Sequence, residues 1–196
     1  MGASAFRPVP TVRSRRSFTL LAVLLAAVLS CRGGDATPDR RTLIDSRDRY
    51  DPRSLDPTRS TDVPTGRAVA YVFDGLVRFT PDARVVPALA ERWDVSSDGT
   101  VYTFHLRRGV RFHDGTPFVA RHVVQSFERV LDPAERGGRG WPLYPIQGAR
   151  EYSGQGGIRG LSAPDDSTVV IRLTEPLAIF TKLLAMPVAA IVPDSI

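Results

Sequence analysis

Three histidines are the side chains in this 196-residue sequence best suited to acid–base or metal chemistry. They are His105, His113 and His122. His113 precedes Asp114, and a histidine beside a carboxylate could form an acid–base pair or part of a metal site. However, Asp114-Gly115 is a typical turn dipeptide, and adjacent residues rarely point their side chains at one another. The pattern therefore favours a turn.

Other signatures of catalysis are missing from the sequence. It has no His-x-x-x-His pair, no Gly-x-Ser-x-Gly motif and only one cysteine. The glycine run at 154–157 is not a dinucleotide fingerprint, because no strand pattern precedes it and no apolar helix pattern follows. We therefore expect a protein that is not an enzyme and that uses no cofactor and no bound metal.

Residues 1–30 have the three parts of an export signal: a basic segment, an apolar run and a cleavage region. The apolar run 18–29 is shorter than the roughly 20 residues that a membrane-spanning helix needs. Arg15 and Arg16 resemble the pair in twin-arginine signals, although a general secretory signal with two arginines explains them equally well.

Cys31, the only cysteine, follows Val28-Leu29-Ser30, an arrangement that resembles a bacterial lipobox. A lone thiol is a liability in an oxidising compartment, and this favours lipidation of Cys31 over ordinary cleavage that leaves the thiol free. We expect an exported protein, held by a lipid anchor in the periplasm or at the cell surface. Residues 31–41 are polar and rich in structure breakers, as is typical of a tether.

The net charge of +5 does not indicate nucleic-acid binding. Four of the arginines lie before residue 31, where there is no acidic residue, so the processed chain is nearly neutral. No basic stripe with interleaved aromatic residues remains. We therefore expect no nucleic-acid partner.

The elements that would position these residues alternate between strands and helices. Residues 101–107 alternate between apolar and polar side chains and predict a strand, which a turn at 108–109 and residues 110–112 would extend into a hairpin. Ser97-Asp98-Gly99 predicts another turn. The apolar spacing predicts a helix over 68–76, and a strand is expected at 42–45.

Further along the chain, Thr116-Pro117 favours the start of a second helix that ends at Leu131. Residues 132–160 contain half of the glycines and predict a long loop. Expected next are a strand at 168–173, a helix from Glu175 to Leu184 and an exit strand at 186–193.

Several spaced motifs resemble those of the family 5 extracellular solute-binding proteins, the group that binds oligopeptides and dipeptides. The resemblance rests on Leu55-Asp56-Pro57, on Asp74-Gly75-Leu76, on the long segment Val86–Gly115, and on the passage from Gly148 to Gly154. Residues 119–122 depart from the family pattern, because the usual Thr-Ala-x-Asp helix start is Val-Ala-Arg-His here.

The resemblance implies an α+β fold: the first lobe of a type II periplasmic-binding-protein fold with its small subdomain, without the second lobe. Residues 42–73 would supply a strand and loop of the main lobe. Residues 74–191 would form the small subdomain, and 192–196 would begin the return to the main lobe.

In function, the resemblance implies a non-catalytic receptor that delivers peptides to the permease of an ABC importer. An oligopeptide or dipeptide is the expected ligand, although nickel- and sugar-binding members share these motifs. Thr61-Asp62-Val63 is similar to a loop that lines the ligand, but Asp62 also suits a helix N-cap. Trp141 reaches either the ligand cleft or the underside of the long loop. The alternative is a truncated fragment that binds nothing.

Overall fold

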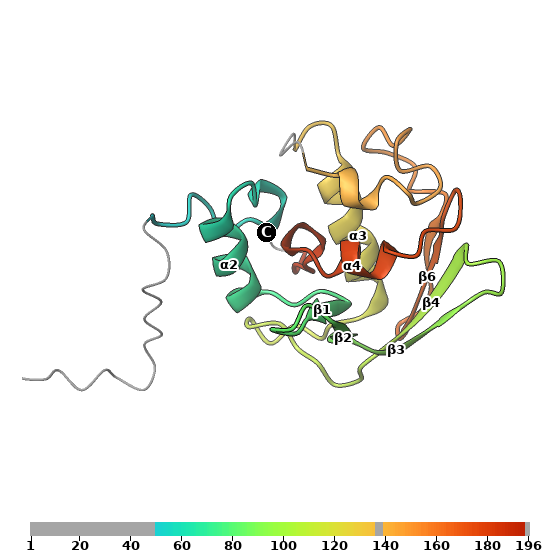
Figure 1. The fold of residues 1–196 in the computed structure, drawn as a ribbon, viewed down its shortest axis with the longest axis horizontal. Helices are drawn as coiled ribbons and strands as arrows, with labels where there is room; N and C mark the ends of the chain where they lie inside the picture. Colours follow the sequence, from blue (N-terminus) through green and yellow to red (C-terminus); the bar gives the residue numbers. More distant parts are fainter. Residues whose placement is uncertain (1–49, 136–138, 195–196) are drawn as a thin grey trace, which may run out of the picture. The chain divides into compact units, whose positions relative to one another are not determined.

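The computed structural model of the chain describes residues 50–135 and 139–194. A four-stranded antiparallel sheet with the order β3-β4-β6-β5 forms one side of this part of the molecule (Figure 1). Its strands are β3 (Ala90–Val95), β4 (Val101–Leu106), β5 (Leu161–Asp165) and β6 (Thr168–Arg172). The mixture of helices with an antiparallel sheet agrees with the expected α+β class.

One face of the sheet is apolar because side chains alternate along the strands. In β4, Tyr102, Phe104 and Leu106 are buried, and the residues between them are partly exposed. On the neighbouring strand β6, Val169 lies opposite Phe104 and Ile171 lies opposite Tyr102, and both are fully buried. The predicted alternation of 101–107 and the predicted strand at 168–173 are therefore confirmed.

Helix α3 (Ala120–Leu131) packs against β5 and β6. Val123, Phe127 and Leu131 recur every fourth residue and are buried, so one stripe of the helix faces the apolar core. The helix ends at Leu131 as predicted, with Asp132 as its C-cap in an extended conformation.

A second group of elements packs beside this core. It consists of η1 (Pro57–Arg59), α2 (Val63–Val72) and η3 (Pro187–Ala189), which contact one another, and η3 also contacts α3. We call residues 53–72 and 187–194 the α2 cluster. The short helices α4 (Phe180–Leu184) and η2 (Trp141–Leu143) contact each other, and α4 also contacts the hairpin of β1 (Val77–Phe79) and β2 (Val85–Pro87).

The strand predicted to pair with β4 in a hairpin is wrong. Residues 110–112 do not pair with β4, whose two edges are taken by β3 and β6. Instead, Phe112 N–H donates to the carbonyl of Thr116, and Phe118 N–H donates to that of Val110. The turn at Asp114-Gly115 therefore closes a small loop of its own. The turn predicted at 97–99 does connect β3 to β4, and Gly99 has a positive φ of 71°.

The start predicted for α3 at Thr116-Pro117 is wrong. Pro117 forms a bridge with Arg111, which keeps this segment extended, and the helix begins at Ala120 with Val119 as N-cap. Val119 has no side chain that can cap the helix. Instead, a side chain within the helix bonds back to the N-cap residue: the Nδ1 atom of His122 accepts a hydrogen bond of 3.0 Å from Val119 N–H.

Other elements also differ from the prediction. Helix α2 ends at Val72, because Phe73 is extended, so Leu76 lies outside it. Helix α4 begins at Phe180 rather than at Glu175. The segment predicted as an exit strand contains η3 and forms no strand, although Ile191 N–H donates to the Asp74 carbonyl.

The hairpin β1–β2 and strand β5 were not predicted, because their strands are short and only weakly alternating. The strand predicted at 42–45 lies outside the described residues.

Candidate functional site

The segment predicted to line a ligand, Thr61-Asp62-Val63, leads directly into α2. Asp62 is the N-cap of this helix, and its Oδ1 atom accepts a 2.8 Å hydrogen bond from Thr65 N–H. The pKa of Asp62 lies below its ordinary value, chiefly because of that hydrogen bond and less because of the charges of Arg53 and Arg139. The carboxylate is thus engaged by its own helix. The capping role considered for Asp62 is confirmed.

Trp141 lies in the long loop at the start of η2, and 48% of its surface is exposed. The next two residues, Pro142 and Leu143, are buried and hold η2 in place. The indole is therefore not sealed under the loop. It offers a partly exposed aromatic surface on a supported turn.

Arg139 brings the two predicted segments together. Its guanidinium NH2 group donates a 2.9 Å hydrogen bond to the carbonyl of Thr61, across 78 positions of sequence. Arg139 is two residues from Trp141, so this bond ties the loop that carries Trp141 to the segment that precedes α2. Sequence reasoning missed Arg139, since one arginine in a glycine-rich loop gives no periodic signal.

An ion pair to α3 anchors the residues that precede Thr61. The guanidinium of Arg129, on α3, donates to both carboxylate oxygens of Asp56, at 2.9 and 2.7 Å. Both side chains are only 20% exposed. Burial raises the pKa of Asp56, but the hydrogen bonds from Arg129 and Thr58 outweigh burial and hold that pKa below its ordinary value.

The three histidines do not assemble into a site. His113 is exposed, and Asp114 beside it accepts a hydrogen bond from Thr116 N–H, as expected for a turn. His105 contacts Asp94 at 2.9 Å on the open face of the sheet, and His122 is buried in α3. Within residues 50–135 and 139–194, no group of three or more His, Cys, Asp or Glu residues could hold a metal ion.

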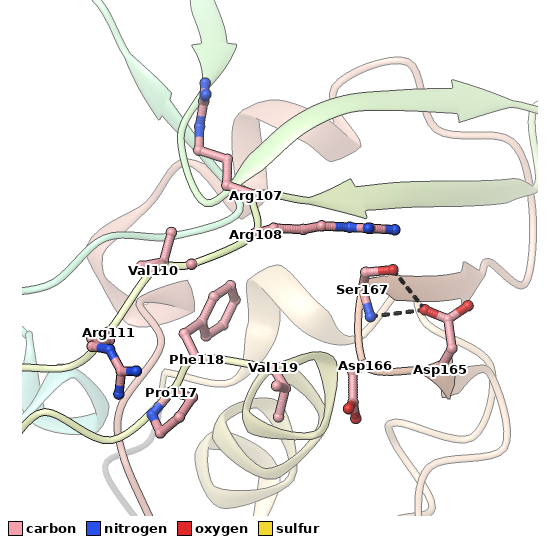
Figure 2. Close-up of a pocket in the computed structure, with 11 residues that line it drawn as sticks. Arg107, Arg108, Val110, Arg111, Pro117, Phe118, Val119, Asp165, Asp166 and Ser167 are labelled. Carbon is pink, nitrogen blue, oxygen red and sulfur yellow. Dashed lines mark hydrogen bonds between the residues drawn. The ribbon is translucent and has the colours of Figure 1, made fainter.

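A pocket of about 670 Å³ opens between the loop after β4 and the β5–β6 turn (Figure 2). Arg107 and Arg111 in its wall donate to nearby backbone carbonyls, and Asp165 accepts from the backbone and hydroxyl of Ser167. Figure 2 shows that the side chain of Arg108 extends over Ser167 rather than toward the other arginines. The charged groups that line this pocket therefore do not converge on one point. None of the predicted ligand-binding residues lines this pocket.

The predicted export and lipidation residues, Arg15, Arg16 and Cys31, lie outside the described residues. In the part of the chain that the structure describes, no helix combines the length and apolar character needed to cross a membrane.

Comparison with known proteins identifies relatives over most of the chain. The family model described as "Bacterial extracellular solute-binding proteins, family 5 Middle" matches residues 84–195, more than half of the chain. The chain is 31% identical to the periplasmic oligopeptide-binding protein OppA of Escherichia coli, over 94% of this chain and 35% of that protein. It is 38% identical to di/tripeptide-binding protein 4 of Pseudomonas aeruginosa, over 71% of this chain and 28% of that protein.

Solved structures give the same result. The Escherichia coli murein tripeptide binding protein MppA matches with a TM-score of 0.69 and 30% identity, over 74% of this chain and 29% of its own. Haemophilus influenzae OppA in complex with the peptide RPPGFSPFR matches with a TM-score of 0.69 and 26% identity, over the same shares.

These neighbours are type II periplasmic binding proteins, in agreement with the expected fold, and the chain spans about a third or less of their length. These relatives are named as binding proteins rather than enzymes. The sequence matches and the shared fold show that the chain belongs to the bacterial extracellular solute-binding proteins, family 5.

Proposed function

We propose that the chain forms one side of the ligand site in the substrate-binding component of an ABC importer for peptides. The observation that carries the proposal is the hydrogen bond from Arg139 to Thr61, which joins the segment before α2 to the loop of the half-exposed Trp141. The similarity to proteins named for oligopeptide and di- or tripeptide binding supports the same ligand class.

The chemistry of this surface suits an extended peptide. Asp62 has extended backbone angles, and the N–H groups of Thr61 and Asp62 have no backbone hydrogen-bond partner within the described residues. A peptide in the extended conformation can accept hydrogen bonds from such groups, as when a strand is added at a sheet edge. Val63, which is 68% exposed, and Trp141 would supply apolar contacts that tolerate different side chains.

The proposal is tested by calorimetric titration of the whole gene product with the peptide RPPGFSPFR and with tri-alanine. We expect the wild type to bind at least one of them. Trp141→Ala should weaken binding at least tenfold, because aromatic anchors in contact surfaces commonly contribute more than 1.4 kcal/mol. Phe79→Ala removes another exposed aromatic ring, on β1, and serves as the matched control that retains affinity. Equal affinity of the two variants would overturn the assignment of this surface.

The alternative function is that of a truncated fragment that binds nothing, and the chain covers 35% and 28% of these two relatives. In that case the whole gene product would have the mass of this chain and would show no heat of binding with either peptide. Residues 32–196 by themselves should not bind either, because we propose that a second lobe supplies the opposite wall of the cleft.

We further propose export by way of residues 1–30 and lipidation of Cys31, consistent with relatives that are named periplasmic. The permease of an ABC importer would then be the protein partner. Metabolic labelling with palmitate should mark the wild type and not Cys31→Ser. Replacing Arg15 and Arg16 together by lysine should block export only if the twin-arginine route is used.

A further inference from the structure

Helix α3 carries a second face that is polar and inward-facing. His122, Ser126 and Arg129 follow one another at spacings of four and three residues, so they share one side of the helix. His122 and Ser126 are 0% and 2% exposed, and the Arg129 side chain is 20% exposed. Polar groups in such positions cost free energy unless they are paired. Each of the three contacts a part of the α2 cluster, as follows.

The first two residues contact the segment that follows η3. The hydroxyl of Ser126 accepts a 3.0 Å hydrogen bond from Val192 N–H. The Nε2 atom of His122 lies 3.6 Å from a carboxylate oxygen of Asp194, and Arg121 lies 3.8 Å from the other oxygen. The polar face therefore holds Val192 through Ser126, whereas the Nε2 atom of His122 has Asp194 beyond hydrogen-bonding distance and has no hydrogen-bond partner within the described residues.

The third residue, Arg129, holds the segment before α2. Its two bonds to Asp56 leave the Asp56 Oδ1 atom able to accept from the N–H and hydroxyl groups of Thr58 as well, at 3.0 and 2.9 Å. Asp56 is thus at once the N-cap of η1 and the anchor of η1 on α3. One carboxylate fixes both the start of the turn and its attachment to the core.

Only η1 and Ser60 separate this anchor from Thr61. On the far side, Asp62 caps α2, and Thr65, which is fully buried, accepts a hydrogen bond from Arg53 N–H. The segment 61–63 is held before its start by Asp56 and at its end by the cap of α2, and Arg139 bonds to the Thr61 carbonyl between them. Its position therefore depends on where Asp56 is held.

We propose that Arg129 is a positioning residue for the peptide-binding segment Thr61–Val63, acting through its two-pronged bond to Asp56. This inference rests on the proposed function and adds to it the residue that places the segment. A guanidinium is required because its planar fork engages both carboxylate oxygens and fixes direction, whereas a lysine ammonium forms a point contact that leaves the carboxylate free to rotate.

The chain offers a matched control on the same carboxylate. Arg59 also lies near Asp56, at 4.0 Å, but its side chain is 65% exposed. Arg129→Met and Arg59→Met each remove one positive charge beside Asp56, and only the first removes the fork. We measure amide hydrogen exchange at Thr58, Thr65 and Gly66 by NMR in the whole gene product. Arg129→Met should speed exchange about ten- to hundredfold, Arg129→Lys by less, and Arg59→Met less than threefold.

Peptide affinity separates positioning from a general loss of stability. Val123→Ala truncates a fully buried residue on the apolar face of α3 and destabilises the fold without removing either bond between Arg129 and Asp56. Titration with RPPGFSPFR should show at least tenfold weaker binding for Arg129→Met and unchanged binding for Val123→Ala at a temperature where both are folded.

The two readouts distinguish the failure of this inference from the failure of the proposed function. Unchanged exchange at the three amides in Arg129→Met would overturn the positioning role, whatever the peptide does. Equal loss of affinity in Arg129→Met and Val123→Ala would also overturn it. Faster exchange in Arg129→Met with a wild type that binds no peptide would support control of the segment by Arg129 while removing its assignment to peptides.

Discussion

The sheet with α3 and the α2 cluster are stabilised in different ways. The sheet core is built from fully buried apolar residues such as Phe104, Phe127 and Ile171. In η1 and α2 few side chains are buried, and two of those are threonines, Thr58 and Thr65. Around them lie large apolar side chains that remain exposed: Tyr50, Leu55, Val63, Tyr71 and Val72.

The difference shows which kind of interaction fixes which kind of geometry. Apolar burial is proportional to area and has no preferred direction, so it makes a stable base that tolerates small shifts. Ion pairs and caps are directional, and they fix one orientation of a short segment. A binding loop needs a defined position on a stable scaffold, and here the two requirements are met by two different parts of the molecule.

The largest effect should come from truncating the core of the sheet. We expect Phe104→Ala to lower the free energy of unfolding by about 3–5 kcal/mol, because it leaves a cavity in the apolar core. Val95→Ala, on the partly exposed edge strand β3, is the apolar control and should change it by less than about 1 kcal/mol. Urea denaturation followed by circular dichroism measures both. Similar losses would mean that the sheet is not the stable base.

A second test concerns Gly160, a position in the sheet region where nearby backbone atoms leave no room for a side chain. A Cβ atom added at Gly160 would lie 2.6 Å from the Arg172 carbonyl oxygen and 2.7 Å from the Gln147 nitrogen. Since both are backbone atoms, Gly160→Ala should cost about 2–3 kcal/mol. Gly109→Ala places its methyl in open space at a positive φ and tests strain alone, at about 1 kcal/mol. The same denaturation assay would contradict this if Gly109→Ala were the worse variant.

The polar face of α3 gives a third, smaller effect. His122→Phe keeps a ring against Phe112 and Phe118 but removes the acceptor for Val119 N–H. We expect a loss of about 1–2 kcal/mol, because a part-buried donor is left unpaired. The exposed His113→Phe should have no measurable effect on the melting temperature. If His122→Phe left the free energy of unfolding unchanged, apolar packing alone would hold the start of α3.

The smallest effect should depend on pH. Because the pKa of folded Asp56 is lowered, its bonds to Arg129 stabilise the fold above the unfolded value of about 4, and this contribution is lost as the pH falls through the lower folded value. Asp56→Asn should therefore be about 1 kcal/mol less stable than wild type at pH 7, with a difference that shrinks below about pH 4. Asp82→Asn, an exposed carboxylate paired with Arg84, is the control. A difference that does not vary with pH would contradict a role for the charge.

Sequence reasoning succeeded where a local pattern was sufficient and failed where a distant partner decided the outcome. The alternation of Tyr102, Phe104 and Leu106 predicts β4 because one face must be buried. The pairing of β4 was predicted incorrectly, since nearby residues 110–112 compete with the distant β6 and the choice depends on tertiary contacts. The start of α3 was misplaced because Pro117 pairs with Arg111 and remains extended.

The residues of the candidate site show the same distinction between local patterns and distant partners. Asp62 could be recognised as a cap because capping is local, and its structure agrees. Arg139 and Arg129 could not be found, since each acts on a residue more than seventy positions away. One usable signal existed for the second: polar residues at spacings of four and three on the otherwise amphipathic α3.

The sequence by itself determined the strand alternation, the long loop and the family motifs, because these depend on residue types at short spacing. Only the tertiary structure decided the strand order, the start of α3 and the joining of Thr61 to Arg139 and of Asp56 to Arg129. The physical reason is that hydrogen bonds and ion pairs between distant segments require both partners to be brought within about 3 Å, and no local pattern encodes that distance.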